Sequence, residues 1–279
     1  MPISGHVSDH DRFISRRRCT GESNREIRRQ LRTEAGPLMP SAGTYLQQIL
    51  EAGLLVAACR AVDGVHCVRG TVDGQVHVIV KAGLSRHRIG LQVTDEALDH
   101  LLSAILPMQI DDEPYGVMGL RPSPARGHLD LVLREGGRTA LARLHGVTRA
   151  RWQQARDFVR DTRSPAIPFW ESSPRETHIA EAGFTHLREL YPMGLMSEVL
   201  RRYLLLKSAD WIDMHTVGDA AKVRWCRGPA ATDVAAQLAD PVCGIADLDV
   251  CPEPLSTSVE RVVLKLPHRG RPRHGRQRA

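Results

Sequence analysis

The sequence predicts an α+β fold in which helices pack on antiparallel sheets. Segments with apolar residues at helical spacing alternate along the chain with short segments rich in β-branched residues, and no internal repeat orders them. Apolar residues make up 42% of the 279 residues, which is enough to bury a sizeable core. Aromatic residues make up only 4%, so Leu, Val, Ile and Ala must form most of that core.

The N-terminal part predicts a flexible arm followed by a winged-helix-like module. Residues 1–20 mix Ser, Asp, His and Arg without periodicity, which is typical of an arm. Residues 21–82 contain two helical segments followed by a segment of strand character, which is the element order of a winged helix. N-cap residues at Ser23 and Asn24 indicate the start of the first helix, and the second is expected to end at Gly53.

A β-hairpin is predicted at the end of this module, within residues 54–80. β-Branched residues partly alternate there, and Asp63-Gly64 and Asp73-Gly74 are strong turn dipeptides. The second turn of the hairpin is expected at Asp73-Gly74. The linker between the two helices is longer than the turn usual in this motif, so an ordinary helical pair is the alternative.

Residues 83–267 predict a larger domain of helices and antiparallel sheet. Residues 107–127 are rich in Pro and Gly and lack periodicity, so they are expected to form a long loop or an internal domain boundary. The expected strands are 88–93, 128–134, 139–144, 222–226 and 259–266. The expected helices are 94–106, 148–161, 176–191, 193–208 and 231–238.

The net positive charge of the chain lies at its two ends. Residues 1–32 carry eight Arg and four acidic residues, residues 268–279 carry five Arg and no acidic residue, and the whole chain has a net charge of +6. The region between the ends is therefore slightly acidic, and the ends are expected to meet a polyanion. Residues 268–279 have nothing to bury, so we expect a disordered basic tail that adds salt-dependent affinity or serves as a solubilising terminus.

These observations predict a nucleic-acid-binding protein with DNA as the expected ligand and other protein subunits as further partners. A bacterial regulator or a component of a mobile-element, replication or defence complex would fit. Arg can contact phosphates or guanine, and Gln and Thr can contact base edges. The predicted contacts lie on the first helix, on the second helix and in the tail: Arg25, Arg28, Arg29, Arg32, Thr44, Gln47, Gln48, Arg269, Arg271, Arg273, Arg276 and Arg278.

An RNA-binding or scaffold subunit of a ribonucleoprotein assembly is the first alternative. Arg-rich surfaces would then hold the RNA backbone by its shape. The second predicted helix distinguishes the two functions, because base readout in DNA requires Thr44, Gln47 and Gln48 to lie in solvent.

An enzyme acting on a phosphorylated or acidic substrate is the second alternative. It requires Asp210, Asp213 and His215 to converge with Arg224 or Arg227 in one pocket. The glycines match neither a dinucleotide-binding nor a P-loop pattern, and no catalytic residue, cofactor or metal is predicted.

A cytoplasmic protein without membrane contact is expected from the remaining features. No apolar run approaches the roughly 18 to 20 residues that span a bilayer, and the N-terminus lacks the apolar region of a secretory signal. The six cysteines are scattered and are expected to be reduced.

Overall fold

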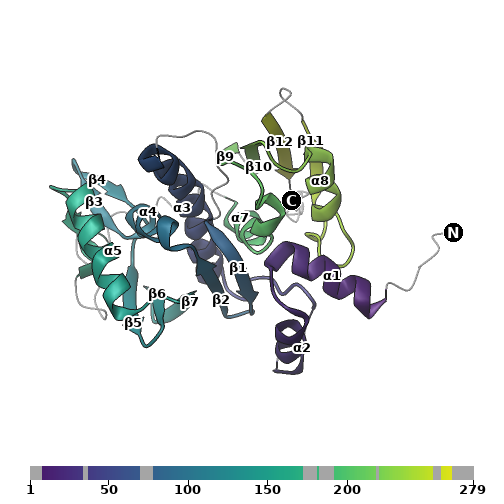
Figure 1. Ribbon diagram of the computed structural model, residues 1–279, viewed down its shortest axis with the longest axis horizontal. Helices are drawn as coiled ribbons and strands as arrows, with labels where there is room; N and C mark the ends of the chain where they lie inside the picture. Colours follow the sequence, from purple (N-terminus) through teal and green to yellow (C-terminus); the bar gives the residue numbers. More distant parts are fainter. Residues whose placement is uncertain are drawn as a thin grey trace, which may run out of the picture.

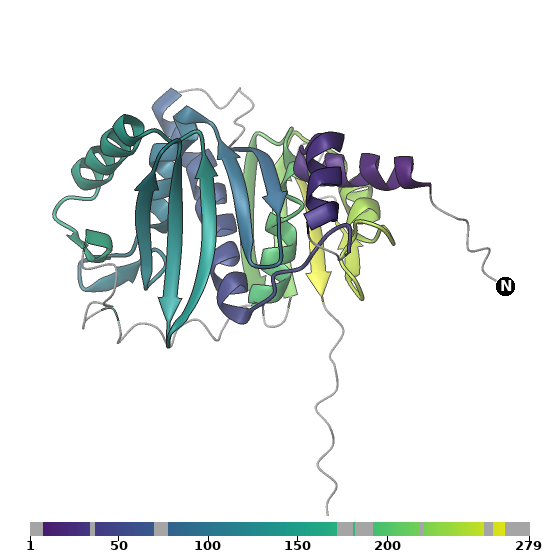
Figure 2. The same ribbon diagram turned by 90° about the horizontal axis from the view of Figure 1, so that it is seen from below.

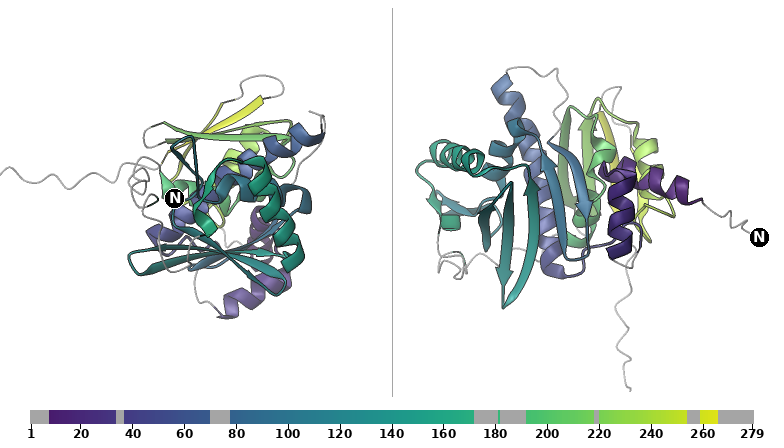
Figure 3. Two further views of the ribbon diagram at one scale, coloured as in Figure 1. Left: turned by 90° about the vertical axis from the view of Figure 1, so that its left-hand side faces the viewer. Right: turned by 60° about the horizontal axis from the view of Figure 1, so that its bottom comes forward.

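A long helix, α3 (Tyr45–Arg69), runs between two β-sheets (Figure 1). The computed structural model describes residues 8–33, 37–69, 78–171, 181, 192–217, 220–253 and 259–265. One side of α3 packs on a five-stranded sheet and another side on a four-stranded sheet. The resulting order of sheet, helix layer and sheet is seen edge-on in Figure 3 (left).

The five-stranded sheet is mixed. Its strands are β1 (Ile79–Leu84), β2 (Arg88–Val93), β5 (Leu120–Ala125), β6 (His128–Glu135) and β7 (Arg138–His145). They lie in the order β1-β2-β7-β6-β5, and β2 and β7 are parallel while the other neighbours are antiparallel. A parallel pair needs a long crossover, which begins here with α4 (Asp95–Ile105) packed on α3.

One face of this sheet is buried and the other is open. Side chains alternate between the two faces along a strand. On β6, Leu129, Leu131 and Leu133 are fully buried, whereas His128 and Asp130 lie on the opposite face and are half-buried. Figure 2 looks onto that outer face, with α3 behind the sheet. The outer face is therefore where the sheet can present side chains to a ligand.

The C-terminal half contributes a second, antiparallel sheet and the helices around it. Its strands lie in the order β11-β12-β10-β9. They are β9 (Trp211–Val217), β10 (Ala220–Cys226), β11 (Asp249–Pro252) and β12 (Val259–Lys265). The helical elements of this half are α7 (Met193–Leu200), the 3-10 turn η3 (Tyr203–Leu206) and α8 (Ala231–Leu238).

A small sheet lies at the far end of α4. It has the order β4-β3-β8, formed by β3 (Met108–Ile110), β4 (Glu113–Tyr115) and β8 (Ile167–Pro168). Helix α5 (Arg149–Thr162) and the 3-10 turn η1 (Phe169–Glu171) complete this end of the molecule. Within the described ranges no helix is long and apolar enough to cross a membrane.

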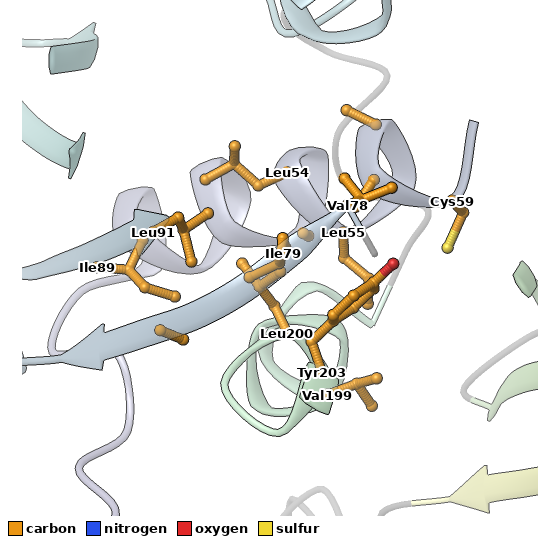
Figure 4. Packing of buried hydrophobic residues seen from close by; sticks show 14 of the residues in the cluster. Leu54, Leu55, Cys59, Val78, Ile79, Ile89, Leu91, Val199, Leu200 and Tyr203 are labelled. Atoms are coloured by element: carbon orange, nitrogen blue, oxygen red, sulfur yellow. The ribbon is translucent and has the colours of Figure 1, made fainter. Parts of the chain in front are cut away.

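α3, the β1–β2 hairpin and α7 share one apolar core (Figure 4). Leu54 and Leu55 of α3, Ile79 of β1 and Leu200 of α7 are each at most 1% exposed. Each such side chain contributes about 1.5–3 kcal/mol when it leaves water. The same cluster continues into both sheets, so no break in the core separates the two halves.

A buried ion pair ties α3 to the end of α7. The Arg201 Nε donates to Glu51 Oε2 over 2.7 Å, and Ser197 Oγ donates to the same oxygen over 2.6 Å. Arg201 and Glu51 are fully buried. Arg201 also donates to the carbonyl oxygens of Pro40 and Ser85, so one guanidinium joins four segments of the chain.

The predicted α+β class is confirmed, as are most predicted elements. α2 (Asn24–Thr33), β2, α4, β6, β7, α5, β10, α8 and β12 match the expected segments to within two residues. The helix expected at 193–208 is shorter, because α7 ends at Leu200 and η3 follows. The helix expected at 176–191 falls almost wholly outside the described residues.

The prediction of a flexible arm is wrong for residues 9–20, which form the helix α1 (Asp9–Thr20). Ser8 Oγ caps its first turn by accepting from the Asp11 N–H, and Gly21 ends it at a φ of 70°. Its residue Arg16 is fully buried. A helix this polar gave no apolar stripe to detect, and tertiary contacts hold it in place.

The prediction of a hairpin within residues 54–80 is also wrong for the part that the structure describes as α3. Residues 54–69 continue α3, and the turn at Asp73-Gly74 lies outside the described residues. α3 is buried on more than one side, so its apolar residues follow no single stripe and resemble a buried strand. The described residues therefore do not confirm a winged helix.

Residues 107–127 are not one long loop, because they contain β3, β4 and β5. Pro122 and Pro124 lie in β5, which is the last strand of its sheet. An edge strand tolerates proline because its outer N–H groups need no partner. Proline was therefore a misleading signal for a loop at this place.

Candidate nucleic-acid interface

A groove of about 630 Å³ lies on the outer face of the five-stranded sheet, over β1, β2 and β7. Gly83 of β1 lies opposite Gly90 of β2, and Gly90 lies beside Arg143 of β7. Residues of α2, including Glu26 and Arg29, line the groove from the other side. The groove thus has a floor of two glycines between a helix and a charged strand.

Gly83 is not required by the backbone of the sheet. A Cβ atom at Gly83 would meet no heavy atom closer than the Gly90 carbonyl oxygen at 3.7 Å, and its φ is not positive. A β-branched residue would suit a strand better at this position. Gly83 therefore leaves room for a ligand to approach the backbone closely, whereas the His145 imidazole occupies the corresponding space at Gly90.

The cationic side chains that line the groove are Arg29, Lys81, Arg88 and Arg143. Lys81 forms an ion pair with Glu26, and Arg143 Nε donates to Asp130 Oδ1 over 2.8 Å. Arg29 and Arg88 form no ion pair within the described ranges of the chain. These two guanidinium groups are free to bind an anion.

The two glutamates at the groove already have cationic partners. Arg16 Nε donates to Glu22 Oε2 over 2.7 Å. The hydrogen bond from Lys81 lowers the pKa of Glu26 to about 2, so Glu26 is ionised at neutral pH. Because both carboxylates are compensated, Arg29 and Arg88 leave the groove with an excess of positive charge.

His145 lies over Gly90 at one side of the groove. A Cβ atom at Gly90 would be 2.7 Å from His145 Nε2, so the imidazole occupies the space that a side chain would need. Partial burial lowers the pKa of His145, and the neighbouring Arg143, His128, Lys81 and Arg88 lower it further. The lowered pKa favours the neutral imidazole at pH 7, and a nearby anion would raise that pKa.

Three comparisons with known proteins give no match. No protein-family model, curated protein or solved structure matches this chain. The chemistry of the groove is therefore the basis for assigning a ligand. Unpaired guanidinium groups beside the open backbone at Gly83 suit an extended anion that lies close to the backbone there.

All four arginines predicted on the first helix are exposed on α2: Arg25, Arg28, Arg29 and Arg32. Arg29 lines the groove. The Arg28 guanidinium carbon lies 5.6 Å from the centre of the Phe13 ring, which ties α2 to α1 through a cation–π contact. α2 thus adds positive charge beside the groove. The predicted tail contacts, within residues 268–279, lie outside the described residues.

The second predicted helix does not present its glutamines for base readout. The prediction that Gln47 lies in solvent is wrong, because Gln47 is 1% exposed. Its side-chain Nε2 donates to Leu141 O over 3.2 Å, and Leu141 N donates to its Oε1 over 3.0 Å, so the amide pairs with β7 like a further strand residue. Gln48 is half-buried and Thr44 is exposed.

The carboxylates of the alternative enzyme site are each held by an arginine. Arg227 Nε lies 3.0 Å from Asp210 Oδ2, and Arg224 pairs with Asp213 across β9 and β10. His215 Nδ1 lies 3.5 Å from Asp213 Oδ2. In the part of the chain that the structure describes, no three His, Cys, Asp or Glu side chains come together in a way that could hold a metal ion.

Sequence reasoning missed most of the groove. The alternation in β2 already places Arg88 and Gly90 on one face, opposite the buried Ile89 and Leu91. That pattern could have identified an open, basic sheet face. The parallel pairing that brings Arg143 beside Gly90 could not be read from it, because the pairing is between segments far apart in the chain.

Proposed function

We propose that the protein binds nucleic acid through the sugar-phosphate backbone, and that the groove between α2 and β7 holds one strand. The observation that carries the proposal is that Arg29 and Arg88, whose guanidinium groups form no ion pair among the described residues, line the same groove as the open backbone at Gly83. A guanidinium can bind two phosphate oxygens at once, and such charge-assisted hydrogen bonds are strong.

The shape of the groove favours a single strand. The groove runs over β1, β2 and β7, and since neighbouring strands of a sheet lie about 4.8 Å apart, these three strands span only about 10 Å. A duplex is far wider than this spacing, whereas an extended single strand can lie along it with phosphates toward the arginines. No Phe, Tyr or Trp side chain lines the groove within the described residues, so His145 is the one ring there that a base could stack on. Binding would therefore rest on the phosphates, and sequence preference should be weak.

Binding of a fluorescent poly(dT) strand of about 20 nucleotides tests the proposal. In the double variant Arg29→Gln/Arg88→Gln, affinity at low salt should fall at least about tenfold. The slope of log affinity against log salt should become shallower by about 1.4, because each phosphate contact on a single strand contributes about 0.7.

The variant Arg138→Gln/Arg149→Gln is the matched control. Both arginines are exposed and neither lines the groove, so this variant removes the same charge from elsewhere. Its affinity should change by less than about threefold. Equal losses of affinity in the two double variants would show that only the net charge of the protein matters. That result would contradict the groove as the binding site. Both variants keep residues 268–279, so any contribution of the tail is the same.

A sequence-specific DNA regulator is a narrower form of this proposal, supported by the exposed Thr44 and the arginines of α2. It is less well supported than backbone binding, since Gln47 is engaged with β7. An RNA-containing assembly is the alternative, because a poly(U) strand offers the same phosphates. Measuring poly(dT), poly(U) and a duplex in one assay separates these possibilities, and tighter binding of the duplex would contradict the single-strand groove.

A further inference from the structure

A second hollow, of about 540 Å³, lies between α3, α7, β9 and the loop after β4. Its lining is mainly apolar and rich in methionine. Of the seven methionines in the chain, four line this one cavity: Met118, Met193, Met196 and Met214. A volume of this size lies within the range of about 300–1,000 Å³ that is usual for small-molecule sites.

The cavity has one fixed wall. A Cβ atom at Gly53 would lie 2.3 Å from Val117 Cγ2, and one at Gly116, whose φ is +81°, would lie 2.2 Å from the Leu106 carbonyl oxygen. These close fits hold the loop after β4 against α3 and α4. Met193 and Met196 of α7 and Met214 of β9 also line the cavity, and such flexible, polarisable side chains can adjust to an apolar chain.

Among the described residues that line the cavity, one is an arginine or lysine. Arg60 of α3 lines it, is exposed and forms no ion pair within the described residues. Its guanidinium carbon lies 5.2 Å from the centre of the Tyr115 ring, and Tyr115 Oη accepts a hydrogen bond of 3.0 Å from Arg163. The contact with Tyr115 holds Arg60 beside the apolar lining, and its charge is left for a ligand.

We propose that this cavity binds a small amphipathic carboxylate, such as a medium-chain fatty acid. The apolar chain lies among the four methionines, and the carboxylate pairs with Arg60. The methionine side chains provide the apolar surface that removes the ligand's hydrocarbon chain from water. The Arg60 guanidinium favours an anionic head group, because it can form a charge-assisted hydrogen bond with a carboxylate. This proposal does not depend on nucleic-acid binding, because the cavity and the groove share no lining residue.

The methionines themselves provide the test. In the full chain labelled with ¹³C at the methionine methyl groups, decanoate should shift the signals of Met118, Met193, Met196 and Met214. Met39 and Met108 are buried but do not line the cavity, so their signals should stay in place. Absence of shifts, or equal shifts in Met39 and Met108, would overturn the proposal.

Two variants test the orientation of the ligand. Arg60→Gln should weaken decanoate binding about tenfold and leave the binding of decanol unchanged, because decanol has no carboxylate. Val56→Phe, on the half-buried face of α3 that lines the cavity, should weaken both ligands. Equal affinities of decanoate and decanol for the unmodified protein would overturn the assignment of Arg60, and this result does not depend on how either variant folds.

Discussion

The arginine of the buried Glu51–Arg201 ion pair and the arginines of the groove lie in opposite surroundings. Arg201 is fully buried, and its donors are taken up by Glu51 and by the carbonyl oxygens of Pro40 and Ser85. Arg29 and Arg88 lie at a groove and form no ion pair within the described residues. All three are arginines, but Arg201 stabilises the fold, whereas Arg29 and Arg88 are available to a ligand.

This contrast shows that the number of arginines in the chain says little about binding. Several arginines lie in the interior, where they hold segments together: Arg16, Arg121, Arg201 and Arg202. Arg202, for example, donates to the carbonyl oxygens of Cys243 and Gly244 over 2.6 Å each. The atoms around a guanidinium, and not its position in the sequence, decide whether it binds a phosphate.

Replacing Glu51 with Gln should have the largest effect. Arg201 would keep its charge in the core without a carboxylate, so the free energy of unfolding should fall by about 3–5 kcal/mol. Urea denaturation followed by circular dichroism measures this loss. Arg88→Gln should change the free energy of unfolding by less than about 0.5 kcal/mol. A loss below about 1 kcal/mol in Glu51→Gln would erase the contrast between the two regions.

Gln47→Ala sharpens the contrast with a smaller effect. It leaves the N–H and C=O of Leu141 without their side-chain partner, which should cost about 1–3 kcal/mol of stability. The affinity for poly(dT) should not change. The neighbouring Gln48→Ala, at a half-buried position, is the control and should cost less than about 0.5 kcal/mol. Weaker binding at unchanged stability would instead make Gln47 a nucleic-acid contact.

His145 should make binding depend on pH. A bound polyanion favours the imidazolium, so affinity for poly(dT) should rise about threefold or more as pH falls from about 7.5 to about 5.5. The stability of the ligand-free protein should change with pH in the opposite direction. Because folding lowers the pKa of His145, the free energy of unfolding falls as pH drops below 6.5. His145→Gln should flatten both profiles. If only His128→Gln flattens them, His145 is not the group that responds.

Lys81→Met should produce the smallest effect. The pKa of Glu26 should rise from about 2 toward its ordinary value of 4.5, which a ¹³C NMR titration of the side chain would measure. The stabilisation from this pair is present above pH 4.5 and is lost as pH falls toward 2, so the variant should lose less stability in acid. An unchanged pKa of Glu26 in the variant would mean that the hydrogen bond from the Ser23 backbone N–H, and not the one from Lys81, lowers this pKa.

Local patterns predicted the strands and helices that have one buried and one exposed side. β2, β6 and β7 alternate, and α4 carries acidic residues in its first turn, so their bounds were predicted closely. α3 was cut short in the prediction because it is buried on several sides and shows no single apolar stripe. α1 was missed because its order depends on Arg16 meeting Glu22 and Leu38, which are tertiary contacts.

The candidate site was only partly predictable, because several of its residues become neighbours only in the tertiary structure. The arginines of α2 were identified from charge and helical spacing, and Arg29 does line the groove. Gln47 was assigned to the exposed side because the sequence does not show that β7 lies beside it. Arg88 and Arg143 come from strands that only the tertiary structure makes neighbours.

The parallel pairing of β2 with β7 also fixes when the groove can form during synthesis. Gly90 and Arg143 are 53 residues apart in the chain but become neighbours in the sheet. A ribosome must therefore release α4, β5 and β6 before β7 can complete the wall, and such non-local closure comes late in folding. A nascent chain that ends before His145 has α2 and its arginines but no closed groove. The groove, and with it the proposed binding site, would thus stay incomplete until β7 had been made.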